Sequence, residues 1–329
     1  MKLASLKHGR DGRLIVVSRD LDRAAPAEDA APTLQAALDD WDSVAPTLEA
    51  IYAALNDGSC TTAFPLDMSA LAAPLPRAYQ YLDGACYICH IRRNREARGD
   101  TLPDDIMDAP LIYQGISHGY GAWNDPIVQD PADFIDFEAE IAAITGDVPR
   151  GVSADAAGQY IRLFCLLQDT SLRRIVAPEL KRSFGFLTAK PESFLGPVVV
   201  TPDELGDLWD GKMVSGTMKV TLRGERVGCI EAGIDSPFHY GDAIAHVAQT
   251  RNFPAGTVLG LGTVSNEAAD DDPSIGAGCI GEYRAMETIK TGKAELAFMQ
   301  PGDRVRIELF DRAGQSVMGA IDQEVVWPA

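Results

Sequence analysis

The sequence predicts an α+β protein with a small N-terminal domain at residues 1–75 and a larger C-terminal domain at residues 76–329. In the C-terminal part, long non-helical connections separate most of the predicted strands, which favours a largely antiparallel or mixed β-roll over a doubly wound sheet. Pro74 and Pro76 disfavour a continuing helix and mark the boundary between the two domains. No glycine-rich phosphate-binding motif follows a predicted strand, so the sequence gives no support for nucleotide binding.

The N-terminal part combines a hairpin with a helix. Residues 2–7 and 13–18 have the composition of strands, and the turn-rich residues 9–12 connect them. Apolar residues then recur at helical spacing over residues 34–55, and Pro46 is expected to interrupt that helix. These elements predict a small α/β domain.

The C-terminal part combines three predicted helices with a larger number of strands. Helices are expected at residues 84–99, with Asp83 at the N-cap, and at residues 153–167 and 237–252. Strands are expected at residues 134–146, 198–201, 217–222, 226–230, 258–264, 304–310 and 316–323.

Composition limits the possible partners. The chain has 329 residues, of which 46% are hydrophobic, and it carries a net charge of -19, which argues against binding to nucleic acid. The first eight residues lack the apolar core of a signal peptide, and no run of 18 apolar residues occurs anywhere. The six cysteines show no disulfide-scaffold pattern. We therefore expect a cytoplasmic protein with reduced thiols and no membrane association.

An acidic segment lies inside the strand predicted at residues 134–146. In a strand, Asp136, Glu138 and Glu140 share one face, and apolar side chains line the other. Adjacent carboxylates repel each other unless a positive group lies between them. The segment is therefore either a site for a divalent cation or an acidic strand face exposed to solvent.

Further candidate residues follow other predicted elements, and each also has a purely structural explanation. Asp83 and His90 lie seven residues apart, on one face of a helix and about 10 Å apart along its axis, which suits a ligand held between them. Asp83 alone could simply cap the helix, and a single histidine is usually not catalytic. Asp169 and Arg173 could be an exposed ion pair at spacing four.

Five motifs occur together in a fixed order along the chain. They are Asp83-x6-His90, Phe137-Glu138-Ala139-Glu140, Asp169-Thr170-Ser171-Leu172-Arg173, Lys190 ahead of Phe194-Leu195-Gly196-Pro197, and Gly262-Thr263-Val264-Ser265. With these motifs, residues 75–329 resemble the fumarylacetoacetate hydrolase family, and the N-terminal part looks like the accessory domain of that family. The resemblance implies a mixed β-roll C-terminal domain, a homodimer, and one Mg²⁺, Ca²⁺ or Mn²⁺ ion per active site.

The resemblance also implies a role for each residue that matches a family position. The implied metal ligands are Asp83, Glu138, Glu140 and Asp169, an all-oxygen set that suits a hard cation. The implied catalytic residues are His90 as general base, Glu287 as the partner that orients it, and Arg173 and Lys190 as cations for a developing oxyanion. The implied substrate-binding residues are Tyr113, Arg98 and Thr263.

Two departures from the family pattern affect the expected substrate. At positions where the animal enzyme has polar substrate contacts, this chain has Val176 and Leu180, and Ala85 stands where that enzyme has a tyrosine. The substrate pocket is therefore expected to differ, and the identity of the substrate does not transfer.

The implied activity is metal-dependent hydrolysis of a carbon–carbon bond in a β-diketone acid such as fumarylacetoacetate or an acylpyruvate, in the catabolism of aromatic compounds. The family alternatives are a β-keto-acid decarboxylase acting on oxaloacetate and a 2-hydroxydienoate isomerase or hydratase. A His–Glu pair favours hydrolysis over decarboxylation, because loss of CO₂ needs no base to activate water. A metal-binding dimer without catalysis remains as an alternative from another class.

Overall fold

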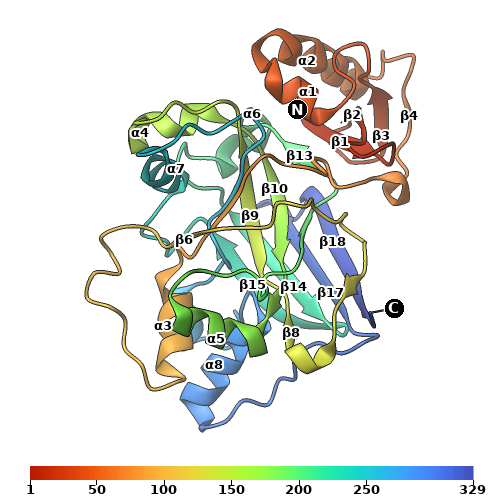
Figure 1. Cartoon of the computed structure of the whole chain (residues 1–329). Helices are drawn as coiled ribbons and strands as arrows, with labels where there is room; N and C mark the ends of the chain where they lie inside the picture. Colours follow the sequence, from red (N-terminus) through yellow and green to blue (C-terminus); the bar gives the residue numbers. More distant parts are fainter. Residues whose placement is uncertain (329) are drawn as a thin grey trace.

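The computed structural model describes residues 1–328 and has a mixed α/β fold, in which a small N-terminal β domain joins a larger C-terminal domain (Figure 1). Two large sheets lie against each other in the C-terminal domain, where strand β10 (Ile161–Asp169) contacts β17 (Arg304–Phe310) and β18 (Ser316–Val326). Their facing side chains form the largest hydrophobic core of the described residues. The predicted fold class is confirmed.

The N-terminal domain contains the predicted hairpin, formed by β1 (Lys2–Leu6) and β2 (Arg13–Val17). Strands β3 (Arg23–Pro26) and β4 (Phe64–Pro65) extend it. Helices α1 (Leu34–Asp39) and α2 (Trp41–Asp57) cover the sheet, and their apolar faces pack on a second core.

The helical region of this domain is interrupted in a different place from the one predicted. The chain leaves the helical conformation at Asp40, and Pro46 lies inside α2. Pro46 is in the second turn of α2, where a proline removes a single backbone hydrogen bond and the rest of the helix continues. The break between α1 and α2 therefore lies at Asp40, six residues before the proline, and Pro46 does not cause it.

One 11-stranded sheet runs through both domains. Strand β1 pairs with β13 (Val199–Val200), and β13 pairs in turn with β10, so the sheet of the N-terminal domain continues into the C-terminal domain. The other strands of this sheet are β5 (Tyr81–Gly84), β6 (Ile112–Gln114), β9 (Ala139–Thr145), β12 (Ser193–Leu195) and β16 (Val258–Gly260).

A second sheet of five strands lies behind the first and has the order β15-β14-β17-β18-β7. Alternate residues of β17 are buried, as expected when one face of a strand meets the core. Strands predicted at residues 217–222, 226–230, 304–310 and 316–323 are all confirmed in this sheet. Besides β17 and β18, this sheet contains β7 (Ile127–Val128), β14 (Gly216–Leu222) and β15 (Glu225–Ala232).

Two predicted helices are wrong in whole or in part. Asp83 belongs to strand β5, and helix α3 begins only at Ile88 and ends at Glu96. The second error concerns residues 153–167, where a short helix α4 (Ala154–Ala157) is followed by strand β10. Strand β10 is buried on both faces, so its apolar residues do not alternate and their spacing also fits a helix.

Helices α3, α5 and α8 gather beside the open end of the large sheet, whereas α4 and α7 pack together at its other end (Figure 1). The remaining elements are α5 (Arg173–Arg182), α6 (Pro202–Leu205), α7 (Tyr240–Ala248), α8 (Ile280–Thr291), β8 (Ile135–Asp136), β11 (Ser171–Leu172) and five 3-10 turns at Met68–Ala70, Pro131–Asp133, Gly158–Tyr160, Gly206–Leu208 and Glu267–Asp270. Among residues 1–328, no helix has both the length and the apolar character needed to cross a membrane.

Candidate active site

Strand pairing brings three distant acidic residues to one end of the large sheet. Strand β16 pairs with β5 on one side and with β9 on the other, and β9 pairs with β10. These strands carry Asp83, Glu140 and Asp169. Glu138 lies just before β9, where it forms a β-bridge with Cys279. The fold thus assembles four carboxylates that are separated by up to 86 positions in the sequence.

A glycine on the middle strand makes room for the carboxylates. Gly260 pairs with Asp83 across the sheet, and a Cβ atom at position 260 would lie 2.3 Å from Asp83 Oδ1 and 2.7 Å from Glu140 Oε2. Neither distance is possible between real atoms, so any larger residue would displace the acidic side chains. Gly260 was not predicted as a site residue, because its function is only to leave space.

The four carboxylates form a compact buried cluster. Asp83, Glu138, Glu140 and Asp169 each contribute one oxygen to a group in which all oxygens lie within 4.8 Å of one another. The four residues are at most 6% exposed. Asp83 Oδ1 and Glu140 Oε1 have no hydrogen-bond partner among the described residues. Buried oxygens of this kind normally have a partner, so these two are suited to binding a positive ion.

Lys190 and Arg173 neutralise only part of this negative charge. Lys190 Nζ donates to Glu138 and, at 2.6 Å, to Asp169 Oδ2, and Arg173 Nη2 donates to Glu138 Oε1 at 2.8 Å. Burial acts to raise the pKa of Glu138, but Lys190 and Arg173 outweigh it and hold that pKa at about 2. Glu138 is therefore ionised at neutral pH.

Among the described residues, no lysine or arginine forms an ion pair with Asp83 or Glu140 on the other side of the cluster. Burial raises the pKa of Asp83 well above its ordinary value, and the charge of Asp169 raises it further. Burial likewise raises the pKa of Glu140 well above its ordinary value, and the charges of Asp83 and Glu138 raise it further. Both shifts favour the protonated carboxyl groups, and a positive ion beside the two residues would oppose these shifts. An all-oxygen group with two unsatisfied oxygens fits a hard divalent cation such as Mg²⁺, Mn²⁺ or Ca²⁺.

His90 lies beside this cluster and is oriented by a buried glutamate. One nitrogen of the His90 ring, one oxygen of Glu138 and the Cys279 Sγ lie within 4.8 Å of one another. His90 Nδ1 is 3.0 Å from Glu282 Oε2, and Glu282 is fully buried. Nδ1 is thus assigned as the protonated nitrogen, which leaves the lone pair on Nε2. Asn94 Nδ2 lies 3.3 Å from Nε2.

The predicted partner of His90 is wrong. Glu287 lies on another face of α8 and accepts hydrogen bonds from the backbone N–H groups of Glu295 and Leu296, so it supports a surface loop. Residues 282 and 287 are five positions apart, which turns a helix by about 140°. Glu282 follows Cys279, the N-cap of α8, by three residues, a position where an acidic side chain is favoured, but this spacing does not indicate a contact with His90.

Asp136 has a structural role that the sequence did not indicate. Its two oxygens accept hydrogen bonds from the backbone N–H groups of Ile280 and Gly281 at the start of α8, at 2.7 and 2.8 Å. Arg173 Nε donates to the same carboxylate at 2.7 Å. Asp136 therefore does not join the carboxylate cluster. It fixes Arg173 and the helix that carries Glu282.

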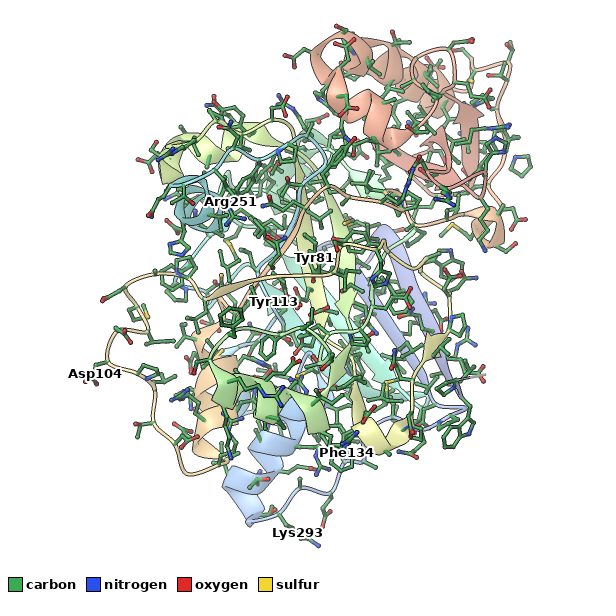
Figure 2. All side chains as sticks on the ribbon, viewed as in Figure 1. Tyr81, Asp104, Tyr113, Phe134, Arg251 and Lys293 are labelled. Carbon is green, nitrogen blue, oxygen red and sulfur yellow. The ribbon has the colours of Figure 1, made fainter. Side chains whose placement is uncertain are left out.

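The cluster and His90 open into one pocket of about 440 Å³. Tyr113, which lies near the centre of the view in Figure 2, donates from its hydroxyl to Asp169 Oδ2 at 2.6 Å. Burial raises the pKa of Tyr113 well above its ordinary value, with Asp169 adding to the effect, so the hydroxyl stays protonated. Thr263 lies in the wall of the pocket, and Arg98 lies at its half-exposed edge beside Asp100. Of the predicted site residues, all but Glu287 thus lie in the pocket lining or, for Glu140 and Asp169, in the carboxylate cluster beside it.

The loop that carries Lys190 is held by one carboxylate on helix α5. Glu179 is 6% exposed and accepts hydrogen bonds from the backbone N–H groups of Leu187, Thr188 and Ala189, at 2.9 to 3.2 Å. Although burial opposes it, these bonds lower the pKa of Glu179 to about 2. Glu179 therefore determines the path of the chain into Lys190.

We expect the Glu179→Gln variant to lose about 1–3 kcal/mol of unfolding free energy, because an amide group replaces an acceptor that faces three backbone donors. The ordinary pKa of a glutamate, 4.5, lies above that of folded Glu179, so the unfolded chain binds more protons between pH 4.5 and about 2. This contribution to stability is complete above pH 4.5 and is lost as the pH falls through that range. Urea unfolding at several pH values measures it, with Lys181→Gln on the exposed side of α5 as control.

Comparison with known proteins identifies the family. The model described as "Fumarylacetoacetate (FAA) hydrolase C-terminal" matches residues 80–326, and the model described as "Fumarylacetoacetase N-terminal domain 2" matches residues 1–77. The chain therefore belongs to the fumarylacetoacetate hydrolase family, and the resemblance seen in the sequence is confirmed. No curated protein sequence matches the chain significantly.

Solved structures of low sequence identity share the fold. Fumarylacetoacetate hydrolase from Exiguobacterium antarcticum aligns with a TM-score of 0.67 at 16% identity, covering 99% of both chains. Maleylpyruvate hydrolase from Sphingobium sp. SYK-6, solved with manganese(II) and pyruvate, aligns with a TM-score of 0.65 at 17% identity, covering 100% of both. A 5-carboxymethyl-2-hydroxymuconate delta-isomerase from Mycobacterium smegmatis aligns with a TM-score of 0.54 at 18% identity, covering 81% of this chain and 84% of that one.

Proposed function

We propose that this protein is a metal-dependent hydrolase that cleaves a carbon–carbon bond in a β-diketo acid of the acylpyruvate class. The observation that carries the proposal is the shared pocket, in which a buried carboxylate cluster fit for a divalent cation lies beside the His90–Glu282 pair. We propose one cation per subunit, with Mg²⁺ first and Mn²⁺ or Ca²⁺ as alternatives. The manganese and pyruvate bound to the Sphingobium hydrolase support this choice of ion and substrate class.

A cation held by Asp83, Glu138, Glu140 and Asp169 would supply one part of the chemistry, namely positive charge that polarises a substrate carbonyl and offsets negative charge on the departing group. His90 Nε2 accepts a proton from water, and the water oxygen then attacks the carbonyl carbon of the acyl group. Glu282 stabilises the resulting imidazolium through Nδ1–H. When the carbon–carbon bond breaks, the same imidazolium returns the proton to the carbon of the leaving enolate.

Positive groups in the pocket stabilise the attacked carbonyl. Lys190 is 7% exposed, and the side chain of Arg173 is 18% exposed, so each cation acts in surroundings that contain little water. Both are held in place by ion pairs, Lys190 with Asp169 and Arg173 with Asp136. Such preorganised charges stabilise a developing oxyanion without reorganising during the reaction. Tyr113 is a neutral hydroxyl donor beside Lys190. The Nζ atom of Lys190 lies 5.5 Å from the centre of the Tyr113 ring.

Apolar side chains in the pocket lining indicate the nature of the acyl group. Val176 and Leu180 on α5, Phe186 on the following loop and Leu111 all line the pocket. Leu111 and Leu180 are 50% and 49% exposed, which is costly for large apolar side chains unless a substrate covers them. We therefore propose that the acyl end of the substrate is apolar and spans several carbons.

An isomerase is the second candidate, because the aligned M. smegmatis structure carries the name of such an enzyme. Isomerisation moves a proton between two carbons and consumes no water, so His90 would act alone on the substrate. Product analysis separates the two activities: hydrolysis of an acylpyruvate gives pyruvate and a carboxylic acid, whereas isomerisation leaves the carbon skeleton intact.

The test is a substrate panel of acetylpyruvate, longer and aromatic acylpyruvates, fumarylacetoacetate, maleylpyruvate and oxaloacetate, with Mg²⁺ or Mn²⁺ and again with chelator. We expect chelator-sensitive release of pyruvate, with kcat/KM about 10-fold or more higher for large apolar acyl groups than for acetylpyruvate. Release of CO₂ from oxaloacetate without hydrolysis of any acylpyruvate would contradict the proposal. Turnover unaffected by chelator would contradict the role of the cation.

A further inference from the structure

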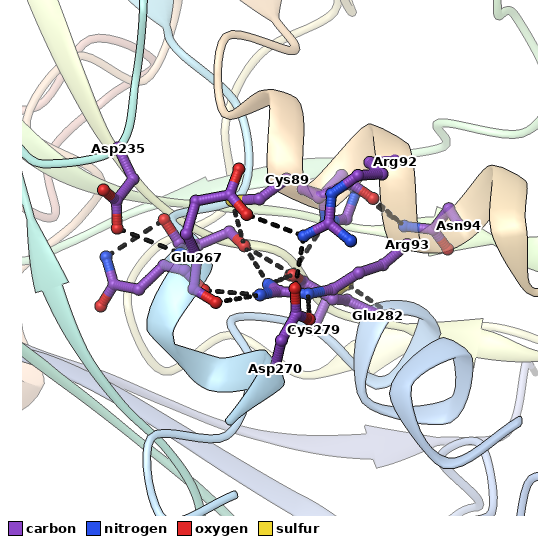
Figure 3. A network of polar contacts seen from close by, with 12 residues as sticks. Cys89, Arg92, Arg93, Asn94, Asp235, Glu267, Asp270, Cys279 and Glu282 are labelled. Carbon is purple, nitrogen blue, oxygen red and sulfur yellow. Dashed lines mark hydrogen bonds and ion pairs between the residues drawn. The ribbon is translucent and has the colours of Figure 1, made fainter. Parts of the chain in front are cut away.

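Arg93 on helix α3 is the largest fully buried side chain among the described residues, with an exposure of 0% (Figure 3). Among the described residues, Arg93 is also the only buried arginine. A buried guanidinium group is costly unless each of its donors has an acceptor. The hydrogen-bond partners of Arg93 therefore indicate what the buried guanidinium group does in the protein.

The donors of Arg93 reach five acceptors. Nη1 donates to Glu282 Oε1 at 2.7 Å and to Ser265 Oγ at 2.9 Å. Nε donates to Asp270 Oδ1 at 2.7 Å, and Nη2 donates to the carbonyl oxygens of Asn266 and Glu267, at 2.7 and 3.1 Å. All of these acceptors except Glu282 lie in the segment from Ser265 to Asp270. That segment thus holds the guanidinium in one orientation against Glu282.

The two oxygens of Glu282 have separate partners. Oε1 accepts from Arg93 and, at 2.5 Å, from the hydroxyl of Ser265. Oε2 is left for His90 Nδ1, at 3.0 Å. Arg93 is therefore the cation that keeps Glu282 charged and turned toward His90. Burial acts to raise the pKa of Glu282, but His90 and Arg93 together lower it.

We propose that Arg93 is a positioning residue that fixes Glu282, and through it His90, in the geometry needed for proton transfer. The proposal rests on the proposed function, in which His90 is the general base. Arg93 is neither in the carboxylate cluster nor in the pocket lining, so its link to His90 runs through Glu282, directly and by way of Ser265.

The neighbouring residue offers a matched control. Arg92 lies on the same helix and also carries ion pairs, with Glu96, Glu267 and Asp270, but its side chain is 25% exposed and makes no contact with Glu282. Arg92→Met and Arg93→Met remove the same charge from adjacent positions and share the partner Asp270. Only Arg93→Met leaves Glu282 without its cation.

The kinetic test compares these two variants and Arg93→Lys on the most active acylpyruvate with Mg²⁺. We expect kcat to fall about 10- to 100-fold in Arg93→Met, as for other residues that orient a catalytic group, with KM changed by less than about threefold. Arg93→Lys keeps the charge beside Glu282 but loses most of the donors, so we expect it to fold and to show an intermediate kcat. Arg92→Met should stay within about threefold of the parent. In Arg93→Ala, added guanidinium at a non-denaturing concentration should restore part of kcat.

The second readout does not depend on turnover. In protein labelled with ¹⁵N-histidine, the Nδ1 proton of His90 should give a downfield resonance that is assigned by its loss in His90→Gln. We expect this resonance to shift or disappear in Arg93→Met and Arg93→Lys and to remain unchanged in Arg92→Met. If the parent hydrolyses no keto acid but the resonance follows Arg93, the proposed function fails and the positioning role stands. If the Arg93 variants match the parent in kcat and in this resonance, the positioning role is overturned and the proposed function stands.

Discussion

Replacing His90 with glutamine is expected to lower kcat by about 10²- to 10⁴-fold, the range that a general base contributes. Glutamine fills a similar volume and can still donate to Glu282, but it cannot take a proton from water. His90 is outside the cluster of four carboxylates that we propose as the cation site, so cation binding should persist. Steady-state release of pyruvate and a thermal-shift titration with Mn²⁺ measure the two effects separately.

The control for this prediction is His246→Gln, which changes a histidine on helix α7 that lies outside the pocket lining. We expect it to retain the activity of the parent. An unchanged kcat in His90→Gln would show that water is activated elsewhere, and loss of Mn²⁺ binding in the same variant would place His90 among the ligands.

Replacing Glu140 with glutamine is expected to change stability in opposite directions without and with metal. Without metal, the variant should melt at a higher temperature than the parent, because glutamine is neutral at every pH, whereas buried Glu140 must either take up a proton or stay charged beside Asp83 and Glu138. With metal, the parent should gain stability and the variant should gain little, because a ligand of the cation is lost. Thermal unfolding with chelator and with excess Mn²⁺ gives both results.

The pH dependence of the chelated protein tests the same feature. The folded pKa of Glu140 is raised above the ordinary 4.5 of the unfolded chain, so the folded state binds more protons above that pH. The stability of the chelated parent should therefore fall as the pH rises above 4.5, and the advantage of Glu140→Gln should widen between about pH 5 and about pH 8. Asp104→Asn, on the exposed loop seen in Figure 2, should show neither effect. A variant that is less stable than the chelated parent throughout this range would contradict the argument.

The sequence predicted the residues of the site better than the elements that carry them. Asp83 was expected at a helix N-cap, and the structure has it on strand β5. Both errors in the C-terminal domain concern strands that are buried on both faces, where the two-residue alternation that normally marks a strand is absent. The order of the motifs along the chain was unaffected by these errors, and it led to the family.

Glu282 could not be found in this way. Its partner His90 is 192 positions away in the sequence, and no local pattern states which glutamate of helix α8 faces inward. Gly260 and the structural role of Asp136 were missed for related reasons. One acts by leaving space and the other by binding a helix N-terminus, and both effects exist only when the strands and helices are in place.

The pairing of β1 with β13 means that the N-terminal domain is not a detachable module. Its strands complete the edge of the sheet whose next members, β10 and β9, carry Asp169 and Glu140 of the carboxylate cluster. A chain cut at residue 76 would expose the backbone donors and acceptors of β13, together with the apolar residues now covered by β1. Such a fragment would tend to pair edge to edge with other copies. The N-terminal domain, which contributes no residue to the pocket, would thus protect the protein from aggregation.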